Sequence, residues 1–173
     1  MEFKDNMATT YEKIATTTLG SAATSMSFTS IGSTYTDLRI VWVGSFAAAG
    51  GSRLSITFNS DTGNNYSYTR LSGNGSAAAS ARNSNQPDVI MGVGDIPQNV
   101  IHLNEIDVFS YAGSTYKSLL IGQALDNNGS GFVFKQVGLW RSTSAITSIQ
   151  LKSYDATNIN AGATATLYGI LKA

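Results

Sequence analysis

Ala163-Thr-Ala-Thr-Leu-Tyr-Gly-Ile-Leu-Lys172 decides the fold of this chain, together with Ser27-Phe-Thr-Ser-Ile-Gly-Ser-Thr-Tyr-Thr-Asp-Leu-Arg-Ile-Val-Trp42. Each stretch contains the alternation of apolar and polar residues that is typical of a β-strand with one buried face. The first is a closing strand near the C-terminus, and the second contains a strand near the N-terminus. The residues between them offer little that could carry out chemistry, so the chain is predicted to be a self-contained β-sandwich that assembles or binds.

The same period-two alternation continues through the chain and predicts an all-β fold. Leu38, Ile40 and Trp42 share one face of a first long strand, and Leu54, Ile56 and Phe58 share one face of the next. Further strands are expected at 66–71, 88–91, 100–111, 116–124, 132–141, 146–153 and 162–171. About nine or ten short strands separated by turn residues indicate a jelly-roll-like antiparallel β-sandwich. We assign residues 1–10 to an N-terminal arm and residues 11–173 to one sandwich domain.

Two stretches interrupt this pattern. Residues 72–87 are rich in Gly, Ala, Ser and Asn and are predicted to be a long exposed loop, and such loops are often functional. In the strand at 100–111, Ile101 and Leu103 alternate in one phase, whereas Ile106 and Val108 follow the opposite phase. An extra residue at Asn104-Glu105 would exchange the two faces, so a β-bulge is predicted there.

Composition narrows the class of protein. Charged residues make up 13% of the chain, compared with about 25% in an average domain. The 11 basic and 11 acidic residues cancel and are scattered, which argues against a nucleic-acid partner or an anionic membrane surface. Ser, Thr, Asn and Gly supply 70 of the 173 residues, as expected for turns and pleated surfaces. A neutral surface with so few charges suggests that partners cover much of it.

Residues with catalytic or metal-binding chemistry are few. His102 is the only histidine, and a Ser-His-Asp site would have to combine it with a carboxylate such as Asp107. Glu105 and Asp107 share a strand face and could form an acid–base pair for glycoside hydrolysis, although a solvated sheet face explains them better. Asp61 and Asp126 begin turns with calcium-like oxygen spacing, but hairpin turns explain them better than a bound calcium. No enzyme activity, cofactor or metal is predicted.

The aromatic residues allow two interpretations. Tyr66, Tyr68, Tyr111 and Tyr116 could form an aromatic platform for sugars or an interface between subunits, but alternating aromatic residues more often pack across strands. Trp42 and Trp140 lie in the most hydrophobic strands, and we assign both to the core.

Four stretches taken in order resemble a family of small virion proteins of tailed phages. They are residues 27–41, Phe58-Asn-Ser-Asp-Thr-Gly-Asn-Asn-Tyr-Ser-Tyr-Thr-Arg-Leu71, Gly138-Leu-Trp-Arg-Ser-Thr-Ser-Ala-Ile-Thr-Ser-Ile149 and Asn160-Ala-Gly-Ala-Thr-Ala-Thr-Leu-Tyr-Gly-Ile170. The similarity runs from about Tyr11 to Ala173, and the six residues before Met7 depart from the pattern. The resemblance implies a jelly-roll-like sandwich, usually trimeric, on the outside of a phage particle, and no enzyme activity.

The resulting hypothesis is a homotrimeric capsid decoration (cement) protein that stabilises the phage head. Its expected partners are further copies of itself and the major capsid protein or other virion proteins. The alternative is a receptor-binding head domain of a tail fibre or spike, in which exposed tyrosines and Asn-rich loops bind host-surface carbohydrate. The residues predicted to contact partners are Met1, Phe3, Tyr11, Arg82, Tyr66 and Tyr68.

Overall fold

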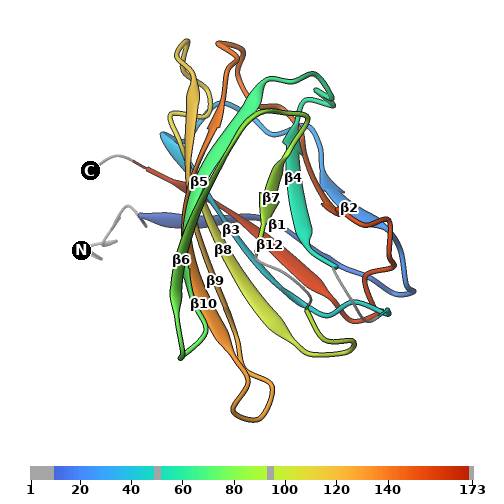
Figure 1. Ribbon diagram of the computed structural model, residues 1–173. Helices are drawn as coiled ribbons and strands as arrows, with labels where there is room; N and C mark the ends of the chain where they lie inside the picture. The colour runs from blue at the N-terminus through green and yellow to red at the C-terminus, as the bar shows by residue number, and fades with distance from the viewer. Residues whose placement is uncertain (1–9, 49–51, 93–95, 172–173) are drawn as a thin grey trace, which may run out of the picture.

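A computed structural model describes residues 10–48, 52–92 and 96–171, which form two antiparallel β-sheets packed face to face (Figure 1). The all-β sandwich expected from the alternation is therefore confirmed. The strands are β1 (Tyr11–Thr18), β2 (Ser25–Phe28), β3 (Asp37–Gly44), β4 (Leu54–Phe58), β5 (Tyr66–Gly73), β6 (Ala78–Gln86), β7 (Val89–Met91), β8 (His102–Phe109), β9 (Lys117–Leu125), β10 (Phe132–Trp140), β11 (Ile149–Ser153) and β12 (Thr164–Ile170). Within these described ranges, no helix has the length and apolar character needed to cross a membrane.

The two sheets differ in size. The large sheet has eight strands in the order β1-β12-β3-β8-β9-β10-β5-β6, and the small sheet has four in the order β2-β11-β4-β7. The two stretches that predicted the fold lie side by side, because β12 pairs with β3 from Ile170 opposite Asp37 to Thr164 opposite Val43. In Figure 1 this pair lies within the large sheet, and β2, β4 and β7 form the facing layer.

The core lies between the two sheets and follows from the alternation. Leu38, Ile40 and Trp42 of β3 point inward with no exposed surface, and so do Leu54, Ile56 and Phe58 of β4. Trp140 is also buried, which confirms the assignment of both tryptophans to the core. Burying side chains of this size contributes about 1.5–3 kcal/mol each, so this layer supplies most of the drive to fold.

The stretch predicted to be a long loop at 72–87 is instead a β-hairpin, so that prediction was wrong. β5 and β6 pair from Gly73 opposite Ala78 to Tyr66 opposite Gln86. The turn between them is held by the Asn74 side chain, whose Oδ1 accepts hydrogen bonds from the backbone N–H groups of Ser76 and Ala77. Most side chains of β6 are exposed, so no apolar alternation marked this strand in the sequence.

The predicted bulge at Asn104-Glu105 was also wrong. β8 pairs with β3 and with β9 in unbroken register. Ile106 and Val108 point into the core, and the inward positions that precede them are occupied by Asn104 and His102. In β8 the apolar residues shift from one set of alternate positions to the other because His102 and Asn104 are polar residues at inward positions, and the backbone contains no extra residue.

The described residues contain twelve strands, compared with the nine or ten expected. β6 was predicted to be a loop, and neither β1 nor β2 was recognised. β1 covers the edge of the large sheet through its pairing with β12, and its outward residues are polar or exposed. Edge strands of this kind lack the clear hydrophobic pattern on which the sequence prediction depended.

Candidate functional site

The outward face of the eight-stranded sheet is a candidate interaction surface of the described chain. The continuous pairing of β3, β8, β9, β10 and β5 aligns its side chains in three rows. The first row is Val43, Leu103, Ala124, Val133 and Gly73, the second is Val41, Glu105, Gly122, Lys135 and Leu71, and the third is Arg39, Asp107, Leu120, Val137 and Thr69. We call these fifteen residues the outer surface.

Several apolar side chains of the outer surface are exposed to solvent. Leu71 is 59% exposed, Val133 58%, Val137 54%, Leu120 42% and Val43 41%. Grouped exposure of this kind on a soluble domain is typical of an interaction site. The small sheet differs, because Gln150 and Lys152 occupy the outward positions of β11, whereas Ser55 and Thr57 at the corresponding positions of β4 are buried.

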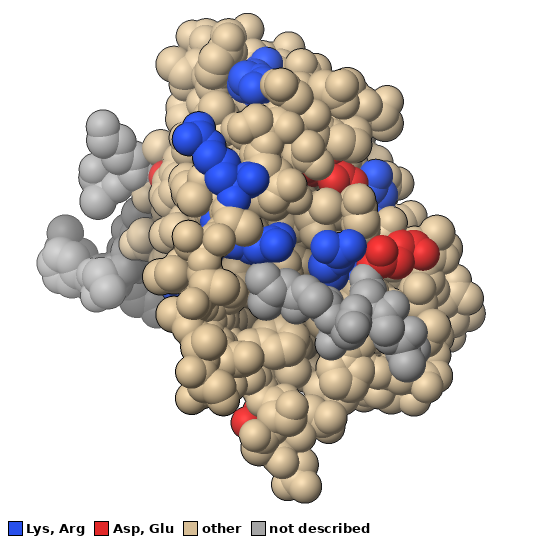
Figure 2. Space-filling model, viewed as in Figure 1, with Lys and Arg blue, Asp and Glu red and all other residues tan. Residues whose placement is uncertain are grey.

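The charges on the outer surface balance each other. Arg39 donates two hydrogen bonds to Asp107, of 2.6 and 2.8 Å, and these outweigh burial and raise the pKa of Arg39. Glu105 and Lys135 flank Gly122 in the second row and form no ion pair with any described residue. Because Gly122 has no side chain, the Lys135 amine lies across it. Figure 2 shows a different side of the molecule, on which several Lys and Arg groups and fewer Asp and Glu groups lie among large uncharged areas.

A groove of about 680 Å³ opens at one end of the outer surface. Val43, Leu103, Ala124 and Val133 contribute to its apolar lining, and the glycine-rich β5–β6 and β9–β10 turns border it. The volume suits a small ligand or a few side chains of a partner. The described lining contains no pair of acids positioned on a common substrate.

The structure separates the residues that a catalytic site would need. His102 points into the core and packs against Trp42 and Phe46, at centroid distances of 4.8 and 5.4 Å. Asp107 points outward from the same strand and is paired with Arg39. Burial lowers the pKa of His102 to about 4, despite a contact of 3.3 Å with the Val100 carbonyl. The structure therefore does not bring the predicted Ser-His-Asp combination together.

A row of buried polar groups crosses the core beside His102, and the sequence prediction missed it. Asn104 pairs in register with Trp42 on one side and Gln123 on the other. Both side-chain amides and the Trp42 indole N–H are buried and lack a protein hydrogen-bond partner. Buried polar groups without protein partners usually bind internal water. The shift of apolar phase in the strand at 100–111 was the signal that could have revealed them.

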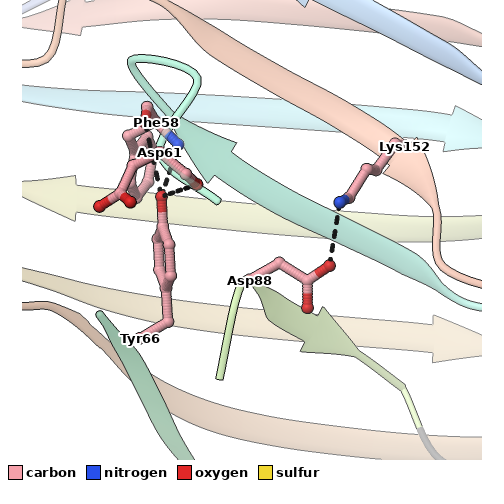
Figure 3. A network of polar contacts seen from close by, with 5 residues as sticks. All are labelled: Phe58, Asp61, Tyr66, Asp88 and Lys152. Atoms are coloured by element: carbon pink, nitrogen blue, oxygen red, sulfur yellow. Dashed lines mark hydrogen bonds and ion pairs between the residues drawn. The ribbon is translucent and has the colours of Figure 1, made fainter. Parts of the chain in front are cut away.

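Tyr66 and Tyr68 are 0% and 3% exposed, so the prediction that they contact partners was wrong and they cannot form a sugar platform. Their burial agrees with the packing across strands that the alternation favoured. The Tyr66 hydroxyl accepts a hydrogen bond of 3.0 Å from the Phe58 backbone N–H and lies 3.3 Å from the Asp61 carbonyl (Figure 3). Burial raises the pKa of Tyr66 well above its usual value. Tyr111 is also buried and Tyr116 is exposed, so the four tyrosines form no common platform.

The turn that begins at Asp61 uses its carboxylate internally. Asp61 accepts hydrogen bonds from the Gly63 N–H, the Asn65 amide and the Trp140 indole at 2.7–3.2 Å. Burial alone would raise the pKa of Asp61, but these hydrogen bonds outweigh it and lower that pKa. Asp126 similarly accepts from the Gly129 N–H. A search of the described residues finds no cluster of three or more His, Cys, Asp or Glu side chains that could hold a metal ion.

The remaining predicted partner residues have different positions. Met1 and Phe3 lie outside the described residues. Tyr11 begins β1 and is 48% exposed, with the Arg39 guanidinium 5.6 Å from the centre of its ring. Arg82 is exposed on β6, the opposite edge strand of the large sheet.

Comparison of the chain with protein-family models, curated proteins and solved structures finds no match.

Proposed function

We propose that this chain is a non-enzymatic structural protein of a phage virion, which decorates and stabilises the capsid as a homotrimer. The observation that carries the proposal is the outer surface: a wide sheet face, with exposed apolar side chains and balanced charges, that suits docking on protein. The alternation of consecutive strands between the two sheets, from β1 through β4, supports a jelly-roll-like connection. The resemblance is the support for a location on the outside of the particle.

The mechanism follows from mass action. A protein that binds the assembled shell more tightly than its separate subunits stabilises the shell. Several copies joined in one oligomer attach as a unit, because after the first contact the others form at high effective concentration. The partners in this proposal are other copies of the chain and the major capsid protein, and catalysis has no part in it.

The location can be tested by immunogold labelling and electron microscopy of particles whose genome encodes the chain. The proposal predicts label over the head, and predicts that heads lacking the protein release their DNA at lower temperature. Label confined to the tail, or heads of unchanged stability, would refute capsid decoration.

A receptor-binding head domain of a tail fibre or spike is the second candidate, and the groove favours it. The groove lies between two turns that contain Asn74 and Asp126, whose polar groups could contact a sugar above an apolar floor. We expect specific signals on a glycan array under this alternative, and their loss after Asn74→Ala. Tail labelling together with glycan binding would favour this candidate over decoration.

A further inference from the structure

The arrangement of side chains on the outer surface has an approximate symmetry about β9. β8 and β10 lie on either side of β9, and β3 and β5 lie beyond them. Acidic Glu105 on β8 and basic Lys135 on β10 occupy equivalent positions on opposite sides of Gly122. The apolar pairs Leu103 and Val133, and Val41 and Leu71, are placed in the same way.

We propose that two copies of this chain pack with their outer surfaces facing each other, about a two-fold axis that runs along β9. Such an axis exchanges β8 with β10 and β3 with β5. Glu105 of each copy then faces Lys135 of the other, so two ion pairs form across the contact. Leu103 faces Val133, Val41 faces Leu71, and Leu120 meets its own counterpart near the axis.

Charge complementarity selects a second copy as the occupant of this surface. Glu105 and Lys135 have no ion-pair partner among the described residues, and a two-fold contact provides one for each. The other two central charges, Arg39 and Asp107, already neutralise each other. Ala124 lies close to the axis and is small, whereas the space above Gly122 is occupied by the Lys135 amine, which brings this charge close to the axis.

The area of the large sheet is sufficient for a stable contact. Seven strands, from β12 to β6, lie symmetrically about β9. At about 4.8 Å apart, and with about seven residues each at roughly 3.3 Å per residue, they span about 780 Å². A standard protein interface buries about 800 Å² on each partner. Each sheet twists from strand to strand, so the two faces diverge away from the axis, and the correspondence is closest near Gly122 and weaker toward the edges.

This inference goes beyond the proposed function, because it concerns how two copies meet and does not require a virion. It assigns the outer surface, as a protein-docking face, to a second copy, and leaves the contact with the shell to another face of the assembly. It adds a two-fold contact to the three-fold contacts of the proposed homotrimer. The full chain is therefore expected to form an even-numbered assembly: a dimer through this surface alone, or a hexamer where both contacts form.

Charge reversal provides the test. In the E105K variant, and equally in K135E, like charges would face each other twice in every pair of copies. In sedimentation velocity, we expect each variant alone to have half the mass of the wild-type assembly. The dissociation constant of the two-fold contact should be raised about tenfold or more. An equimolar mixture of the two variants brings opposite charges together at both positions, so we expect the mixture to regain the full mass. Charge rearrangement within one copy cannot produce this rescue.

Gln150→Lys, on the exposed face of the small sheet, is the matched control and should keep the wild-type mass. Circular dichroism verifies that each variant is folded. A wild-type monomer or trimer, single variants of unchanged mass, or a mixture that stays dissociated would each overturn the inference. Charge-reversal variants that keep the wild-type mass but no longer bind particles would assign the outer surface to another virion protein, and would also overturn the two-fold contact. The labelling of heads tests capsid decoration separately and does not depend on this result.

Discussion

Acid should destabilise this protein through His102, its only histidine. The side chain is 2% exposed and packs between aromatic rings, and burial lowers its pKa from 6.5 to about 4. The unfolded chain therefore binds a proton as the pH falls through 6.5, whereas the folded protein does not bind one until about pH 4. The contribution of His102 should therefore lower the free energy of unfolding as the pH falls from 6.5 to about 4, and should stay constant at lower pH.

The size of the effect follows from the width of the window. Each pH unit between the two pKa values is worth 1.36 kcal/mol, so His102 alone should cost about 3 kcal/mol between pH 7 and pH 4. That is a large fraction of the roughly 5–15 kcal/mol by which a domain is stable. Carboxylates with lowered pKa values, such as Asp61, add a loss of stability that is concentrated at lower pH.

The assay is urea unfolding at several pH values, followed by tryptophan fluorescence, for the wild type and His102→Leu. The variant has no titrating group at this position, so its stability should fall by about 3 kcal/mol less than that of the wild type between pH 7 and 4. Nuclear magnetic resonance can follow the imidazole of the wild type directly. Parallel pH profiles for the two proteins, or an imidazole that titrates near pH 6.5, would refute the argument.

Three further predictions concern the packing of the two sheets. Tyr66→Phe removes the hydroxyl that bonds the Phe58 N–H inside the core, so we expect thermal unfolding to show a loss of about 1–3 kcal/mol, and an unchanged melting temperature would contradict this. Gly169→Ala would place a methyl group 2.2 Å from the Tyr35 ring, so we expect a loss of about 1–3 kcal/mol in urea unfolding. Its control, Gly20→Ala, meets no atom within 4 Å and should stay within about 0.5 kcal/mol of the wild type. A high-resolution crystal structure should show ordered water bonded to Asn104 and Gln123, and a dry contact between them would contradict our explanation of their missing partners.

The sequence predicted the strands that have one clearly apolar face. β3, β4, β9, β10 and β12 carry apolar residues at the alternate positions that face the core, although β3, β9 and β10 also carry apolar residues on the outward face. The bounds of these strands lie within two residues of those expected except at the start of β3, which begins inside a longer stretch. Alternation is informative there because successive side chains point to opposite faces of the sheet and one of these faces lies in the core. β6 escaped prediction because its side chains are exposed on both faces and its place depends on backbone hydrogen bonds to β5.

Sites were harder to predict than strands because the same alternation does not say which face is the core. Tyr66, Tyr68 and Arg70 were correctly placed on one face of β5, yet that face points inward, so the tyrosines could not act as a sugar platform.

Conversely, the apolar residues that remain exposed, such as Leu120 and Val137, carry no signal in the sequence that separates them from core residues until both sheets are assembled. The self-complementary placement of Glu105 and Lys135 has the same origin: these residues are 30 positions apart in the chain and become related only through the register of β8, β9 and β10. Interaction surfaces of a sandwich are thus properties of strand order and register, and a sequence with no structural match reveals them only after the sheet is built.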